Sequence, residues 1–242
     1  MTHEQAKTLI EQTPLIAACH GDLSQVQAIL DAQPALIEAL NALTPVVGEE
    51  TPQRAAAHAR QLPILTYLMQ RGVQPDLFMA CALGLTDLLD SYLTAHPKEI
   101  EAKGAHGIAL LVHANDPAVV ELLLRHGVDP SLALVQLSWS GKVDLMQVAM
   151  DRGGQVDSPK QGRRPLQIAA AQGHLAAVEL LLKAGANAQV RARGGDWEFK
   201  TALGLALMNG HTKIAELLRK LSPPPAPAPR RVSQGAPGRF RR

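Results

Sequence analysis

The feature that most constrains this sequence is a helix–turn–helix unit that recurs along it. The unit is clearest at residues 164–186 and returns at residues 201–218. In both places a stretch rich in small residues leads into a Gly-His turn, and apolar residues then recur at spacings of three and four. That spacing predicts a pair of short helices. Such a pair cannot bury its apolar face alone, so the repetition predicts a stack of pairs.

Weaker copies of the same unit extend the pattern upstream. They are found at residues 13–22, 51–72, 80–84, 119–127 and 138–141. Together with the two clear copies they predict about seven helix pairs between residues 13 and 221. Hydrophobic residues make up 46% of the chain but aromatic residues only 3%, so the apolar mass is Ala, Leu and Val, which suits closely packed helices.

The clear copies resemble the ankyrin repeat. Arg164–His174 is similar to the family's T-P-L-H-x-A-A-x-x-G-H, and Val178–Ala186 to its V-V-x-L-L-L-x-x-G-A. The resemblance implies an all-α ankyrin-repeat solenoid of about seven helix pairs, with β-hairpin fingers between pairs. It also implies a protein that binds other proteins through the finger tips and the concave side.

Two junctions between pairs are too short to hold a finger. They are Gly72–Leu77 and Gly127–Leu132, which are near copies of each other and suggest that a block of two repeats was duplicated. Each contains a Pro, which starts a new helix without loss. We therefore expect some β-hairpin fingers to be missing: fingers follow pairs one, three, five and six, and none follows pairs two and four.

The two ends of the chain differ from the repeat region. Residues 1–12 are expected to cap the first pair, residues 13–221 form the repeat domain, and the Pro- and Arg-rich residues 222–242 form a disordered tail. The tail carries several arginines and no acidic residue. The tail could contact RNA, anionic lipid or an acidic protein. Arg230–Ser233 also resembles a kinase site. Alternatively, the tail only keeps the chain in solution.

Candidate partner-binding residues follow from the resemblance. The concave ends of the first helices carry His20, His58, Leu83, His113, Trp139 and Met208. Where fingers are missing, the stripe from His58 to Trp139 should be the most open part, and its large rigid side chains would be natural anchors. Alternatively, Trp139 packs inward between degenerate repeats.

A second candidate cluster is basic and aromatic. The alternating residues 190–200, around a Gly-Gly-Asp turn, predict a two-stranded hairpin as the last finger. It would present Arg191, Arg193 and Trp197 close to Arg163 and Arg164 of the preceding finger. This cluster could receive an acidic partner. Alternatively, Trp197 and Phe199 only staple the hairpin to the final pair and the arginines are solvated.

No residue pattern indicates catalysis, a metal or a cofactor. Cys19 and Cys81 lie in apolar stretches without metal-ligand spacing and are expected to be buried free thiols. No histidine belongs to an HExxH motif, and His174 and His211 occupy the structural turn position of the repeat. The chain is therefore expected not to be an enzyme.

The chain is expected to be cytoplasmic, and a monomer is expected although the sequence does not indicate the oligomeric state. The formal net charge is +2, far from that of a dedicated nucleic-acid binder, so nucleic acid is expected only in weak contacts of the tail. Neither a secretory signal nor an uninterrupted apolar stretch of bilayer length is seen. The main hypothesis is a non-catalytic adaptor or regulator that binds a protein. The alternatives are an effector exported into another cell, with the tail as its signal, and an enzyme or metal protein built on the array.

Overall fold

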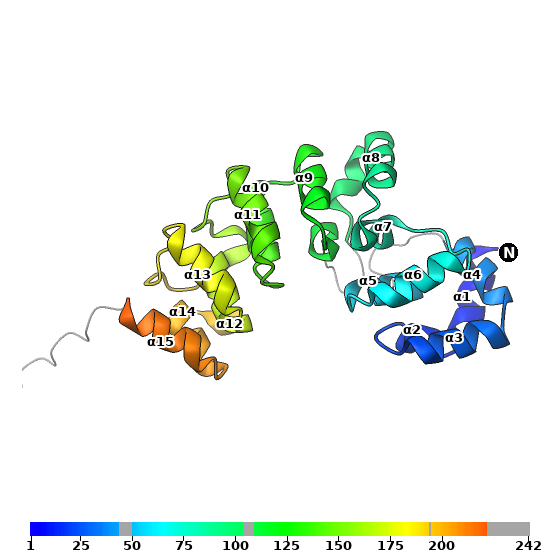
Figure 1. The fold of residues 1–242 in the computed structure, drawn as a ribbon, viewed down its shortest axis with the longest axis horizontal. Coiled ribbons are helices and arrows are strands. Elements are labelled where there is room, and N and C mark those ends of the chain that lie inside the picture. Colours follow the sequence, from blue (N-terminus) through cyan, green and yellow to red (C-terminus); the bar gives the residue numbers. More distant parts are fainter. Residues whose placement is uncertain (44–49, 104–108, 194, 222–242) are drawn as a thin grey trace, which may run out of the picture.

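The computed structural model describes residues 1–43, 50–103, 109–193 and 195–221, apart from the side chain of Gln161. These residues form fifteen α-helices and several short 3₁₀ helices, and no β-strand occurs among them. The helices stack side by side along an arch that runs from α1 to α15 (Figure 1). The all-helical solenoid expected from the sequence is confirmed. The predicted tail, residues 222–242, lies outside the described residues.

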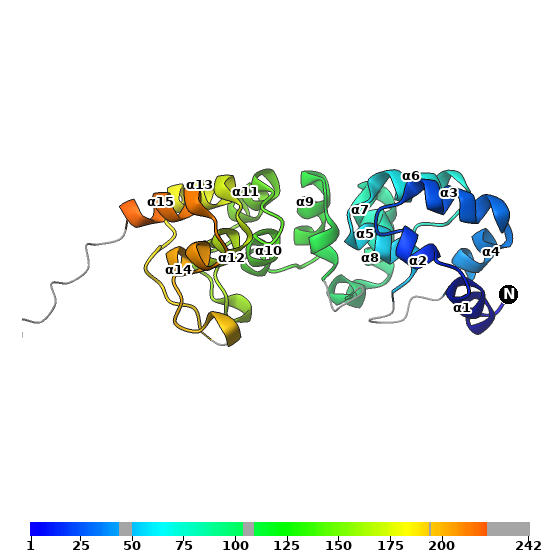
Figure 2. The same cartoon turned by 90° about the horizontal axis from the view of Figure 1, so that it is seen from below.

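Seven helix pairs make up the stack. They are α2 (Leu15–Ala18) with α3 (Leu23–Ala32), α5 (Pro52–His58) with α6 (Leu62–Gln70), α7 (Leu77–Leu83) with α8 (Thr86–Ala95), the 3₁₀ helix η3 (Leu110–His113) with α9 (Pro117–Arg125), α10 (Pro130–Leu137) with α11 (Val143–Asp151), α12 (Pro165–Gln172) with α13 (Leu175–Lys183), and α14 (Ala202–Met208) with α15 (Thr212–Lys220). In the last three pairs the second helices form one row and the first helices lie beneath them (Figure 2).

Small residues let the first helices approach one another. Ala55–Ala57 in α5 and Ala169–Ala171 in α12 are buried, as are the leucines that face them from the second helices, such as Leu68 and Leu181. The buried side chains form one cluster that continues from the first pair to the last. Each pair therefore depends on its neighbours for burial of its apolar face.

The Gly-His turns join consecutive repeats. The Nε2 of His174 donates to the Trp139 carbonyl at 2.9 Å, and the Nε2 of His211 donates to the Ala171 carbonyl at 3.0 Å. Each imidazole lies against the turn glycine of the preceding repeat. A Cβ added to Gly173 would be 2.6 Å from the His211 ring. These histidines are therefore structural, as the resemblance implied.

The two junctions expected to lack a finger do lack one. Helix α6 ends at Gln70 and α7 begins at Leu77, while α9 ends at Arg125 and α10 begins at Pro130. An aspartate caps the new helix in both: Asp76 accepts a hydrogen bond from the Met79 amide at 2.8 Å, and Asp129 accepts one from Ser131 at 2.8 Å. This cap replaces the missing finger as the start signal for the next helix.

The described part of the junction after pair one, where a finger was predicted, contains a helix. The chain instead forms α4 (Ala35–Ala42), which packs against the amino-terminal helix α1 (His3–Glu11). Leu36, Ala39 and Leu40 of α4 are buried. Ala39 and Leu40 lie three and four residues after Leu36, so the three side chains share one helical face. Residues 44–49 of this junction lie outside the described part.

The other three predicted fingers are loops without described strands. After pair three, the 3₁₀ helix η1 (Pro97–Glu101) leads to a single antiparallel bridge between Lys103 and Ala109, and residues 104–108 lie outside the described part. After pair five, the loop contains the 3₁₀ turn η4 (Lys160–Gly162).

The last finger is closed by a pair of backbone hydrogen bonds but is not a regular hairpin. Ala192 donates to the Lys200 carbonyl at 2.8 Å and accepts from the Phe199 amide at 3.0 Å. The tip is the 3₁₀ turn η5 (Gly195–Trp197). Phe199 has φ 61°, in the left-handed region, which a strand cannot accommodate. Of the predicted two-stranded hairpin, the described residues therefore form only these two backbone hydrogen bonds and no strand.

Candidate functional site

Three residues that are far apart in the sequence meet at the finger side of the last three repeats. The indole of Trp139 lies 5.8 Å from that of Trp197, centre to centre, with the planes tilted by 34°. The guanidinium of Arg163 lies 4.5 Å from the Trp197 ring centre and 5.5 Å from the Trp139 ring centre. We call these three residues the arginine–tryptophan platform.

Each member of the platform is held by local structure. Trp139 directly follows the C-cap of α10, and its carbonyl accepts the His174 hydrogen bond. Trp197 ends the turn η5, within the loop that the Ala192 and Lys200 backbone groups close. Arg163 directly follows η4 in the neighbouring finger. The loop of the seventh repeat thus reaches back to the fifth, and Arg163 packs against both indoles.

The platform carries the positive charge of Arg163, and three further arginines, Arg164, Arg191 and Arg193, belong to the same predicted cluster. In the described part of the chain, the guanidinium groups of Arg163 and Arg193 make no hydrogen bond and no ion pair. Arg164 donates to the Asp157 carbonyl, and Arg191 donates to the Phe199 carbonyl at 3.1 Å. Cation–π stacking holds Arg163 in place but satisfies none of its N–H donors, which stay available for a carboxylate.

The predicted basic cluster and the predicted Trp139 anchor therefore form one surface. Arg163, Trp139 and Trp197 are half-buried, whereas Arg191 and Arg193 are exposed. Trp197 contacts Trp139 of the fifth pair. Both indoles are only partly buried, so each has exposed surface that a partner could contact.

The remaining residues of the predicted concave stripe are dispersed. His20 is exposed and lies 3.2 Å from Glu50, and Met208 is exposed at 54% of its surface. His58 and Leu83 are half-buried, and Leu83 packs against the core. None of them takes part in the ring contact or the cation–π contacts that form the platform.

The expected exposure of His113 is wrong. Its side chain is 4% exposed and meets the Phe78 ring edge-on, with the ring centres 5.1 Å apart. Its Nδ1 lies 3.2 Å from the Ala109 carbonyl. Burial lowers the pKa of His113 to about 4, with smaller effects from backbone contacts and nearby cations. The degenerate fourth repeat has a short 3₁₀ first helix, and His113 is its last residue.

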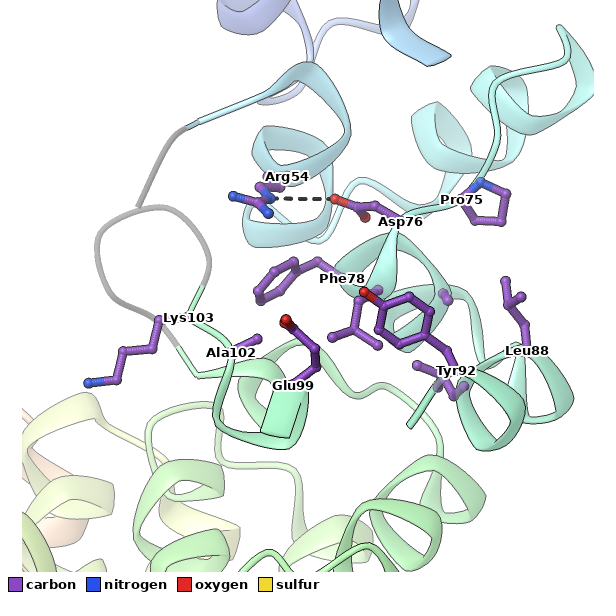
Figure 3. A pocket seen from close by; sticks show the side chains of 12 residues that line it. Arg54, Pro75, Asp76, Phe78, Leu88, Tyr92, Glu99, Ala102 and Lys103 are labelled. Carbon is purple, nitrogen blue, oxygen red and sulfur yellow. Dashed lines mark hydrogen bonds and ion pairs between the residues drawn. The ribbon is translucent and has the colours of Figure 1, made fainter. Parts of the chain in front are cut away.

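A pocket of about 160 Å³ lies beside pairs two and three, and no sequence pattern indicated it. Figure 3 shows Arg54 and Asp76 on one side of it, Phe78 and Tyr92 around it, and Glu99 opposite. These residues come from α5, from the fingerless junction, from α7, α8 and η1. Only stacking of the degenerate repeats brings them together, so no local motif could reveal the pocket.

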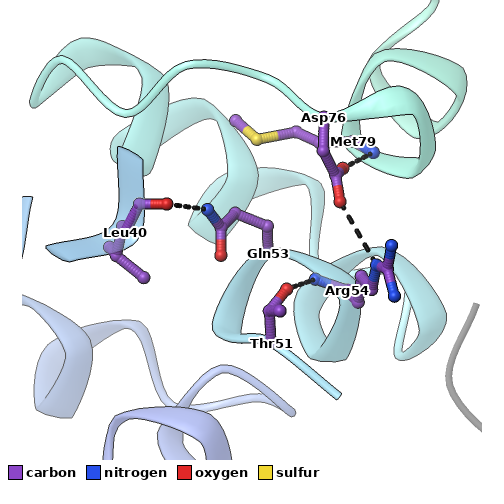
Figure 4. A network of polar contacts seen from close by, with 6 residues as sticks. All are labelled: Leu40, Thr51, Gln53, Arg54, Asp76 and Met79. Atoms are coloured by element: carbon purple, nitrogen blue, oxygen red, sulfur yellow. Dashed lines mark hydrogen bonds and ion pairs between the residues drawn. The ribbon is translucent and has the colours of Figure 1, made fainter. Parts of the chain in front are cut away.

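A buried polar network lies behind the pocket (Figure 4). Arg54 is 4% exposed, and its Nε lies 3.4 Å from the Asp76 carboxylate. The Arg54 guanidinium also lies 4.9 Å from the Phe78 ring centre. In the same helix, Gln53 donates to the Leu40 carbonyl at 3.2 Å. The network ties the second pair to α4 on one side and to α7 on the other.

The described residues contain no cluster suited to metal binding and no activated thiol. No group of three or more His, Cys, Asp or Glu side chains among them could hold a metal ion. Cys19 and Cys81 are buried, and burial raises the pKa of Cys19 to about 12 and that of Cys81 still further. Both thiols are therefore protonated at neutral pH and poorly nucleophilic.

Comparisons with known proteins identify the repeat. A model of ankyrin repeats in three copies matches residues 108–223, the part that holds the platform. No curated protein matched the chain. Within the described residues, none of the helices has the length and apolar content needed to cross a bilayer. The match shows that residues 108–223 consist of ankyrin repeats, and the helix pairs and Gly-His turns of this part agree with it.

Proposed function

We propose that this chain is a non-catalytic adaptor or regulator that binds an acidic segment of a partner protein on the arginine–tryptophan platform. Ankyrin repeats generally mediate protein–protein interaction. The proposal adds a place on this chain and a chemical preference for the partner.

One observation carries the proposal. The guanidinium of Arg163 is fixed over two indoles while its N–H donors lack an acceptor in the described structure. A pre-ordered guanidinium loses little conformational entropy when a carboxylate binds, and the fork of donors suits a carboxylate in two-point contact. The indoles add rigid apolar area beside it. Arg193, Arg191 and Arg164 extend the positive surface.

We propose that the chain binds its partner in the cytoplasm. Cys19 and Cys81 are free thiols, and free thiols are typical of cytoplasmic proteins. The alternative of an exported effector depends on residues 222–242, which lie outside the described residues. Nothing about the platform favours it.

Selection from a random peptide library would test the preference. The wild-type chain should enrich peptides with clustered Asp and Glu, and binding of a selected peptide should weaken as salt is raised, because the contact is between charges. Arg163→Gln should weaken binding of that peptide about tenfold, the scale of one hydrogen bond to a charged group.

Arg219→Gln is the matched control, since Arg219 is exposed in the last turn of α15 and is not part of the platform. It removes the same charge and should leave the peptide's affinity unchanged. Enrichment of peptides without acidic residues, or equal losses in the two variants, would show that the platform does not select acidic partners.

A further inference from the structure

A second candidate site, separate from the platform, is the pocket beside pairs two and three. Its volume of about 160 Å³ is well above the roughly 15 Å³ that one water needs. Apolar residues that line it include Phe78, Leu88, Leu89 and Tyr92. The pocket can therefore take a small organic group rather than only a solvent molecule.

Two carboxylates border the pocket from opposite sides. Asp76 lies at the start of α7, and Glu99 lies in η1. Figure 3 shows the Glu99 carboxylate pointing between the rings of Phe78 and Tyr92, while the amine end of Lys103 points away from the pocket. The Glu99 carboxylate has no hydrogen-bond or ion-pair partner among the described residues.

The arginine beside the pocket compensates only one of these carboxylates. Arg54 lies 3.4 Å from Asp76 and stacks over Phe78, so it is committed to the pocket wall. Asp76 and Glu99 line the pocket as negative groups and Arg54 and Lys103 as positive ones, but Arg54 is paired with Asp76 and the Lys103 amine points away (Figure 3). The Glu99 carboxylate is thus left beside the Tyr92 ring without a cation at ion-pair distance among the described residues.

The pKa values of two ionisable groups of the pocket, Tyr92 and Asp76, are both raised. The pKa of Tyr92 is raised by burial first, and then by the charges of Glu99 and Asp76. The pKa of Asp76 is raised by burial, which outweighs the opposing effects of the Met79 amide and Arg54. Both shifts would be relieved by a positive group placed between the carboxylates.

We propose that this pocket binds one small organic cation, an alkylguanidinium or alkylammonium group, between Glu99 and Asp76 and against the ring of Tyr92. The carboxylates supply the counter-charge, and the ring and leucines cover the alkyl part. An anion would meet the two carboxylates, and an uncharged ligand would leave Glu99 unpaired. The site does not depend on the platform or on its partner.

The cation could be a free small molecule or an arginine side chain of a peptide. The chain's own residues 222–242, supplied by a second copy, are one such peptide, because they hold Arg230, Arg231, Arg239, Arg241 and Arg242 and no acid. Two probes therefore distinguish the sources: n-butylguanidinium, and a synthetic peptide of residues 222–242. n-Butanol serves as the uncharged analogue.

Nuclear magnetic resonance of the full chain reads the site directly. The chain has two tyrosines, and Tyr67, which stacks with Arg71 on α6, is an internal reference. n-Butylguanidinium should shift the ring signals of Tyr92 in a saturable way and leave those of Tyr67 unchanged, and n-butanol should have no such effect. Tighter binding of the peptide than of the small cation would identify a peptide as the source.

Glu99→Gln should weaken binding of n-butylguanidinium about tenfold. Its matched control is Glu101→Gln, which removes an exposed carboxylate from the same 3₁₀ helix without touching this pocket. Both residues are exposed, so folding should be unaffected. The proposal is overturned if neither probe shifts Tyr92, if n-butanol binds equally well, or if the two variants behave alike.

Discussion

The imidazole of His211 lies directly against Gly173 of the preceding repeat, so a Cβ added to that glycine would be 2.6 Å from the ring carbon Cε1. The glycine has φ 81°, and the His211 ring donates to the neighbouring Ala171 carbonyl at 3.0 Å. The Gly-His turn is thus a contact between repeats as well as a turn within one.

Replacing Gly173 by Ala should destabilise the chain more than a strained turn alone would. The left-handed backbone costs about 1 kcal/mol for a residue with a Cβ, and displacing His211 adds about another 1 kcal/mol for its hydrogen bond. Urea unfolding measures the sum. Gly185→Ala is the control, because Gly185 has φ 91° but nothing within 4 Å of its added Cβ. Equal losses at the two sites would contradict the role given to His211.

His113 should make stability depend on pH. Its folded pKa of about 4 lies below the ordinary 6.5, so the unfolded chain takes up the proton first as the pH falls. The contribution is fully present above pH 6.5 and is lost between pH 6.5 and about 4. The shift corresponds to about 3 kcal/mol.

Urea unfolding at several pH values checks this dependence, with His113→Phe as the variant that cannot titrate. The variant should show a flatter profile between pH 6.5 and 4. A profile unchanged by the substitution would mean that another group governs stability in this range.

Trp139 and Trp197 should be energetically coupled. Their ring contact at 5.8 Å predicts a coupling free energy of about 1 kcal/mol in a double-mutant cycle of alanine substitutions. Trp139 and Phe199 form the control cycle, because no ring contact joins them and Phe199 is 65% exposed. Zero coupling between the tryptophans would mean that they do not form a platform in solution.

Arg54→Met should be strongly destabilising. The substitution keeps apolar volume but leaves the half-buried Asp76 carboxylate without its cation, so the loss should be about 3 kcal/mol, the lower end of the cost of breaking a buried pair. Thermal unfolding checks it. The double variant with Asp76→Asn, which keeps a helix-capping side chain, should recover much of the loss. A double variant no more stable than the single one would place the cost in packing rather than in charge.

Local patterns were enough for the repeat itself. The apolar spacing in residues 175–183, the Gly-His turns and the short junction at residues 72–77 each predict helix, turn and missing finger correctly. The reason is that a helix pair and its cap are specified by residues within a few turns of one another. The basic and aromatic members of the platform, such as Arg163 and Trp197, could also be named in advance as one cluster.

The same patterns failed where a residue's neighbours come from another repeat. The sequence determined that the chain is a stack of helix pairs, because every pair exposes an apolar face that only an adjacent pair can cover. Tertiary structure decided that α4 packs on α1, that His113 is buried against Phe78, and that Trp197 reaches Trp139. Those contacts depend on how degenerate repeats bend and close against each other, and that geometry is set by the summed packing of many side chains rather than by any local signal.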